Sequence, residues 1–167
     1  MAKKTNAIVC SVCGKGTLRR RRVDHEVGEL LGLPGVTLRD APAWVCSKCG
    51  EVSVDGAVLE RVSLLLAARI LEQSELAPAE IRYLRKLLGY RQEDLAAKLE
   101  VTRATVNRWE MSKGPVTGPP AYAVRSHVFF RLRSHPAIAQ VAPAFESPGP
   151  RHKGRYTVEG RSLAEAG

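Results

Sequence analysis

Apolar residues recur at every third or fourth position between residues 55 and 76, and this spacing predicts an amphipathic helix that links two parts of the chain. Asp55 is a suitable N-cap for this helix. The apolar stripe is wide for a linker, so it either packs internally or also contacts a partner protein. The stripe comprises Val58, Leu59, Val62, Leu64, Leu65, Leu66, Ile70 and Leu71.

A further helix is predicted from Pro78, because proline is accommodated in a first helical turn, and Gly89 ends it. The side chains expected inside are Ile81, Leu84, Leu87 and Leu88, and those expected in solvent are Arg82, Arg85 and Lys86.

The next segment has the spacing of a helix-turn-helix. One helix is predicted over residues 92–99 and a second from residue 103, across a short turn. Ala96 allows the two helices to approach closely, Val101 fills the turn, and Thr102 caps the second helix. Glu100 stands where such turns usually have glycine, and a positive φ there costs a residue with a side chain about 1 kcal/mol.

The outer face of the second helix carries residues that read DNA bases. It presents Arg103, Ala104, Asn107 and Arg108. Arginine pairs with guanine and asparagine with adenine in the major groove, and Gln92 is placed to reach a phosphate. Any amphipathic helix pair has solvated arginines, but the turn, cap and buried valine together favour DNA binding.

Apolar and polar residues alternate in the N-terminal part, which predicts short antiparallel strands. The alternating segments are 17–19, 23–27, 36–38 and 43–45, followed by a short strand at 52–54, and Gly28, Gly32, Pro34 and Gly35 are expected at turns.

All four cysteines belong to two Cys-x-x-Cys pairs, Cys10/Cys13 and Cys46/Cys49, each followed by glycine. This spacing favours one structural Zn²⁺ per chain, because four thiolates suit a tetrahedral ion and the following glycines permit the tight turns. Disulfides or a redox pair are the alternatives, but disulfides need an oxidising compartment and a thioredoxin-like site uses one pair.

Composition bounds the remaining possibilities. With 167 residues and 44% hydrophobic residues, the chain is expected to be globular, with one ordinary domain or two small ones. It has no apolar run that could span a membrane and no signal peptide, so we expect a cytoplasmic protein. The net charge of +9 indicates a polyanionic partner. A closed four-thiolate shell and four scattered histidines argue against an enzyme, so no catalytic residue is predicted.

Two basic features are less specific. Four successive arginines, Arg19 to Arg22, lie in a predicted strand and should therefore alternate between its faces, where they are solvated or bind an acidic partner or phosphate. The proline- and glycine-rich tail, residues 143–167, is predicted to be disordered.

The order of these motifs resembles the MqsA antitoxin family, which combines a YgiT-type zinc finger with a Cro/C1-type helix-turn-helix. The residues that carry the resemblance are the two Cys-x-x-Cys-Gly motifs, the segment 42–51 and Arg108-Trp109-Glu110. It spans about residues 8–142 and predicts an α+β fold. The expected parts are a zinc domain (1–54), a linker helix (55–76) and a helix-turn-helix domain (77–142).

The resemblance implies a repressor that forms a homodimer through its C-terminal domain and binds a palindromic operator. It also implies the antitoxin of a type II toxin–antitoxin pair, whose partner is an mRNA-cleaving toxin. The four cysteines correspond to the family's zinc ligands and Arg108 to its recognition arginine. The family's DNA-reading asparagine falls at Ala104, so a different operator is expected, with Arg103 as a substitute contact. The alternatives are a transcription factor without a toxin and an adaptor that does not bind DNA.

Overall fold

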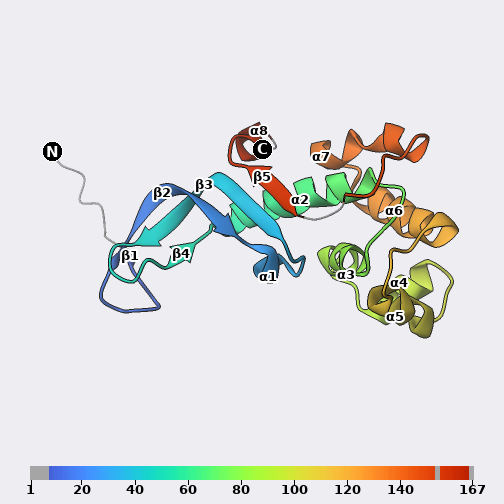
Figure 1. Ribbon diagram of the computed structural model, residues 1–167, viewed down its shortest axis with the longest axis horizontal. Helices are drawn as coiled ribbons and strands as arrows, with labels where there is room; N and C mark the ends of the chain where they lie inside the picture. The colour runs from blue at the N-terminus through green and yellow to red at the C-terminus, as the bar shows by residue number, and fades with distance from the viewer. Residues whose placement is uncertain (1–7, 153–154, 166–167) are drawn as a thin grey trace.

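The computed structural model describes residues 8–152 and 155–165 and shows an α+β fold. An N-terminal antiparallel sheet carries the four cysteines, and a group of helices follows it. The sheet and the helices lie at opposite ends of an elongated molecule, and one long helix, α2 (Gly56–Leu71), leads from the sheet into the helical part (Figure 1).

The sheet is built on a long hairpin. Strands β1 (Ile8–Val9), β2 (Thr17–Glu26), β3 (Val36–Cys46) and β4 (Val52–Ser53) are antiparallel and neighbours in that order. A four-residue helix, α1 (Gly28–Leu31), joins β2 to β3. The pairing slips between Val23 and His25, opposite the stretch where Asp40 has a φ of 47°. The predicted short strands at 17–19 and 23–27 are parts of the single strand β2, and those at 36–38 and 43–45 are parts of β3. The bulge allows the pairing of β2 with β3 to continue past the irregular stretch.

The helical part begins where α2 ends. Helices α3 (Pro78–Leu87), α4 (Gln92–Lys98), α5 (Arg103–Met111) and α6 (Gly118–Leu132) follow in order. Helix α2 ends at Leu71, short of the predicted end near residue 76, because Gln73 pairs as an isolated β-bridge with Gly149 instead. No helix in the described ranges is long and apolar enough to cross a membrane.

The prediction of a disordered tail over residues 143–167 is wrong for the part that the structure describes, residues 143–152 and 155–165; residues 153–154 and 166–167 lie outside the described residues. After α7 (Pro136–Ala139) and a 3₁₀ helix, η1 (Ala142–Phe145), the chain returns to the sheet. There β5 (Tyr156–Glu159) pairs in parallel with Val36 to Arg39 of β3, and α8 (Ser162–Glu165) follows. The described part of the tail is ordered because Tyr156, Val158 and Leu163 are buried against the rest of the molecule.

One continuous cluster of buried side chains runs through both halves. It includes Val36 and Leu38 of the sheet, Leu66 of α2, Leu84 of α3 and Val124 of α6. Helix α2 packs against α3, α7, β5 and α8. The apolar stripe of α2 is therefore largely covered by the protein's own segments.

Candidate metal centre and nucleic-acid interface

The four cysteines converge at the far end of the hairpin. Cys10 and Cys13 lie in the turn after β1, Cys46 ends β3, and Cys49 lies in the turn before β4. All four sulfurs lie within 4.8 Å of one another. The Sγ–Sγ distances are 3.8 Å for Cys10–Cys49 and 3.7 Å for Cys13–Cys46. A Zn–S bond of about 2.3 Å in a tetrahedron requires sulfurs about 3.8 Å apart, so the cluster fits a tetrahedral thiolate-bound metal ion.

The backbone around the cluster favours thiolates. The N–H groups of Gly16 and Lys48 each lie 3.4 Å from a sulfur, of Cys13 and Cys46 respectively. Backbone hydrogen bonds from Cys49 and Lys48 lower the pKa of the Cys46 thiol to about 6. The N–H of Glu51 acts in the same direction on Cys49, but the adjacent Cys46 sulfur and burial raise the pKa of Cys49 to about 12. Neighbouring thiolates repel one another, so a cation is needed to ionise all four together.

Three glycines shape the metal-binding turns. Gly14 and Gly50, each directly after a second cysteine, have φ values of 63° and 74°, which confirms the expected left-handed conformation. Gly16 was not predicted to matter. A Cβ on Gly16 would lie 2.3 Å from the Cys46 sulfur, so only glycine leaves room for the opposite pair of ligands.

The arginine run divides between two partners and solvent. Arg20 pairs with Asp55 at 3.2 Å and lies over the Trp44 ring, and Arg22 pairs with Asp40 at 2.9 Å. Arg19 and Arg21 are exposed and form no salt bridge within residues 8–152 and 155–165. Successive side chains of a strand point to opposite faces, so ion pairs at Arg20 and Arg22 but not at Arg19 and Arg21 fit the predicted alternation.

The helix-turn-helix has the predicted local structure. Leu95, Ala96 and Val106 form a small buried cluster between α4 and α5. Thr102 accepts a hydrogen bond from the Thr105 N–H at 3.1 Å, so the predicted cap is confirmed. Glu100 has a φ of 54°, which confirms the predicted positive φ at a residue with a side chain.

The outer face of α5 is open to solvent. Arg103, Ala104, Asn107 and Arg108 are all exposed. Arg103 lies 3.3 Å from the carboxylate of Glu93, whereas Arg108 forms no salt bridge in the described part of the chain. Both arginines lie on a surface that could face a DNA groove. The ion pair between Arg103 and Glu93 is exposed, so Arg103 can leave Glu93 for a DNA group at little cost in free energy.

Gln92 is held beside this face by a buried acid. Its amide donates to Glu110 Oε2 at 2.9 Å and to Asn107 Oδ1 at 3.4 Å. Gln92 lies at the start of α4 and is predicted to contact a phosphate. Its hydrogen bond to Asn107 therefore links it to a residue predicted to contact a base.

Glu110 is the centre of an ion-pair network that was not predicted. Arg85 donates to both of its oxygens, at 2.6 and 3.0 Å, and also donates to the Tyr90 carbonyl at 2.7 Å. The expectation that Arg85 faces solvent is wrong, since 9% of the residue is exposed. Burial acts to raise the pKa of Glu110, but the hydrogen bonds from Arg85 and Gln92 hold it below its ordinary value. Arg85 and Glu110 are 25 positions apart, so no short-range sequence pattern predicts that they form a pair.

The chain matches a helix-turn-helix family model, HTH_3, over residues 81–123. These residues run from α3 to the first turns of α6. No curated protein and no solved structure shows a significant match. The match and the geometry of α4 and α5 support a DNA-binding domain of the kind found in transcription regulators, which are typically not enzymes.

Proposed function

We propose that the protein is a sequence-specific repressor that binds a palindromic operator as a homodimer and contains one structural Zn²⁺ per chain. The observation that carries this proposal is the exposed face of α5. It presents Arg103, Ala104, Asn107 and Arg108 on a helix whose N-terminus is capped and whose inner side is packed on α4. A helix presented in this way suits the major groove.

The residues proposed to read bases differ in chemistry. Arg108 and Asn107 can form bidentate contacts to guanine and adenine, Arg103 can contact a base or phosphate, and Ala104 can contact only an apolar group such as a thymine methyl. Gln92, at the start of α4, is proposed to bind a phosphate. Because Ala104 stands where the MqsA family has its DNA-reading asparagine, we expect an operator that differs from those of that family.

The zinc proposal is supported by the sulfur distances. Zn²⁺ held by Cys10, Cys13, Cys46 and Cys49 would fix the turns at the far end of the hairpin, where little apolar surface is buried. With four protein ligands the ion would have no open position, so its role would be structural.

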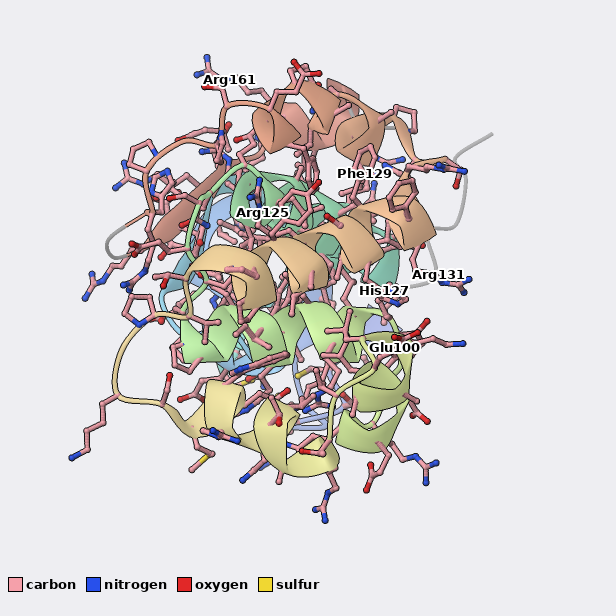
Figure 2. All side chains as sticks on the ribbon, turned by 90° about the vertical axis from the view of Figure 1, so that its right-hand side faces the viewer. Glu100, Arg125, His127, Phe129, Arg131 and Arg161 are labelled. Atoms are coloured by element: carbon pink, nitrogen blue, oxygen red, sulfur yellow. The ribbon has the colours of Figure 1, made fainter. Side chains whose placement is uncertain are left out.

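The dimer proposal is supported by an aromatic surface on α6. Tyr122 and Phe130 are 54% and 60% exposed and line a groove of about 150 Å³ with Phe129 and Phe145. Figure 2 shows Phe129 near the C-terminal end of α6. Two copies that meet through this helical half would present two α5 helices, as a palindromic operator requires.

The test of the DNA-binding proposal is Arg108→Ala in the full chain. Binding to the DNA upstream of the protein's own gene is compared with binding to a scrambled duplex of equal length by fluorescence anisotropy. We expect loss of preference equivalent to about 1–3 kcal/mol, because the arginine's base contact is removed. Arg131→Ala, an exposed position on α6, is the matched control. An unchanged preference in Arg108→Ala would refute the base-reading role.

We further propose that the repressor is an antitoxin, on the basis of the resemblance of its motif order to the MqsA family. The adjacent open reading frame is the candidate toxin. Its product should arrest growth and degrade mRNA when expressed alone, and it should copurify with this protein when the two are expressed together. A harmless neighbour that does not bind would leave a zinc-containing transcription factor without a toxin.

A further inference from the structure

A cavity of about 370 Å³ lies where the C-terminal segment crosses the end of α2. Arg69, Glu72 and Gln73 line one wall, and residues 149–152 line the other. Two backbone hydrogen bonds hold the walls together, from Gly149 N to the Glu72 carbonyl at 2.8 Å and from Ser74 N to the Gly149 carbonyl at 2.9 Å. The cavity is thus built by two segments that are distant in sequence and fixed to each other.

Among the residues that the structure describes, no salt bridge involves the charged side chains that line this cavity. Arg69 projects from α2 and Arg151 from the C-terminal segment, and neither forms a salt bridge within the described ranges. The Nε of Arg151 is buried and has no hydrogen-bond partner there. An oxyanion is the acceptor that guanidinium groups bind most strongly, and both of these arginines line the cavity.

Two further groups narrow the chemistry of a ligand. His152 lies on the same wall as Arg151 and offers an imidazole. Glu72 is the one carboxylate among the cavity's lining residues, and it repels anions but accepts hydrogen bonds. A ligand that satisfies both walls therefore carries an oxyanion at one end and a hydroxyl or amino group at the other.

One residue that lines the cavity, Gln73, belongs to a fixed polar network. Gln73 is 2% exposed, donates to the Tyr156 hydroxyl at 3.0 Å and accepts from the backbone N–H of His152 at 2.6 Å. Tyr156 in turn donates to the Glu80 carboxylate at 2.5 Å. These groups already satisfy one another, so the two arginines remain available for a ligand.

We propose that this cavity binds a small oxyanion metabolite, either a phosphate monoester or a carboxylate, that also carries a hydroxyl or amino donor. Arg69 and Arg151 bind the oxyanion, and Glu72 accepts the hydrogen bond from the donor group. This site is separate from the outer face of α5, and the proposal does not depend on DNA binding.

The test is ligand binding by the full zinc-loaded chain, measured by calorimetry and thermal shift in buffer free of phosphate. The probes are glucose 6-phosphate, malate and, as a neutral control, glucose. We expect saturable binding of at least one anionic probe and none of glucose, and the anion that binds distinguishes a phosphate ester from a carboxylate. A bound ligand also raises the melting temperature with its concentration.

Variants assign the binding to the cavity. Arg69→Gln and Arg151→Gln should each weaken binding at least about tenfold, because each removes a charge-assisted contact. Arg131→Gln, an exposed arginine on α6, is the matched control and should bind normally. Arg69 is exposed, so its variant tests the site even if Arg151→Gln does not fold.

Either of two results would overturn the proposal. One is the absence of saturable binding of both anionic probes at millimolar concentration. The other is binding that survives in Arg69→Gln but is lost in Arg108→Ala, because the probe would then occupy the DNA-binding face. A repressor that fails to bind its operator while still binding the probe would refute the proposed function alone.

Discussion

A glycine outside both cysteine motifs controls how closely the two metal-binding turns approach. Gly16 follows the first pair and faces the sulfur of Cys46 in the second pair. Its role depends on a contact across the hairpin, so the Cys-x-x-Cys spacing alone does not reveal it. Gly14 and Gly50, by contrast, are required by the local turn geometry and are predictable from the motif.

Gly16→Ala should weaken zinc binding about 10- to 100-fold, the range seen when groups that position metal ligands are changed. The reason is the 2.3 Å separation between the added Cβ and the Cys46 sulfur. Competition with a chromophoric chelator measures the affinity. Gly56→Ala is the matched control, because a Cβ there meets nothing within 4 Å. Equal affinities in the two variants would show that the turns can separate without loss of the site.

Glu110→Gln should lower the free energy of unfolding by about 2–4 kcal/mol at neutral pH, because Arg85 would remain buried without its countercharge. Glu93→Gln removes the carboxylate of an exposed ion pair with Arg103 and should cost less than about 1 kcal/mol. Urea denaturation followed by circular dichroism compares both variants with the parent protein.

The same carboxyl group predicts a pH dependence. The pKa of Glu110 is lower in the folded protein than in the unfolded chain, so the unfolded chain binds the proton more readily as pH falls. The stability that Glu110 provides is therefore complete above its unfolded pKa of about 4.3 and decreases as pH falls below that value. Melting temperatures of Glu110→Gln should change less than those of the parent over this range, and parallel curves would contradict the assignment.

At the scale of elements, Glu100 is a residue in a strained turn conformation. Its φ of 54° lies in the region that glycine adopts without cost. Glu100→Gly should therefore stabilise the protein by up to about 1 kcal/mol and leave operator binding unchanged. Glu100→Ala removes the same carboxylate but keeps the strain, so it is the matched control. Thermal denaturation of both variants separates the backbone effect from the loss of charge. A lower melting temperature in Glu100→Gly than in the parent protein would refute the proposal that Glu100 is strained.

The helices and hairpin strands were predictable because their signals are local. Apolar spacing identified α2, α3, α4 and α5, and the cap at Thr102 fixed the start of α5. The strand β5 was not predictable, since four residues in a proline- and glycine-rich tail pair only with a strand more than a hundred positions earlier. The buried ion pair of Arg85 and Glu110 was also not predictable, because its two residues lie in different helices and are distant in the sequence.

At the scale of the whole molecule, the C-terminal segment joins the sheet to the helices. Gly149 pairs with Gln73, just after α2, and β5 pairs with Val36–Arg39 of β3, whereas β4 pairs with Trp44 and Val45 of that strand. Because Val36 and Val158 belong to the same buried cluster as Leu84 and Val124, the two halves share their hydrophobic core. A shared core predicts one cooperative unfolding transition for both halves.

The two tryptophans test this prediction, because Trp44 lies in β3 and Trp109 in α5. With either one replaced by Phe, the remaining fluorescence reports one half, and the two thermal transitions should coincide in the zinc-loaded protein. Val158→Ala should lower the free energy of unfolding by about 1–3 kcal/mol and shift both reporters together, since Val158 is 4% exposed in the common core. Thr157→Ala, exposed on the same strand, should shift neither. If Val158→Ala moved the Trp44 transition alone, the C-terminal strand would stabilise only the sheet, and the halves would be independent folding units.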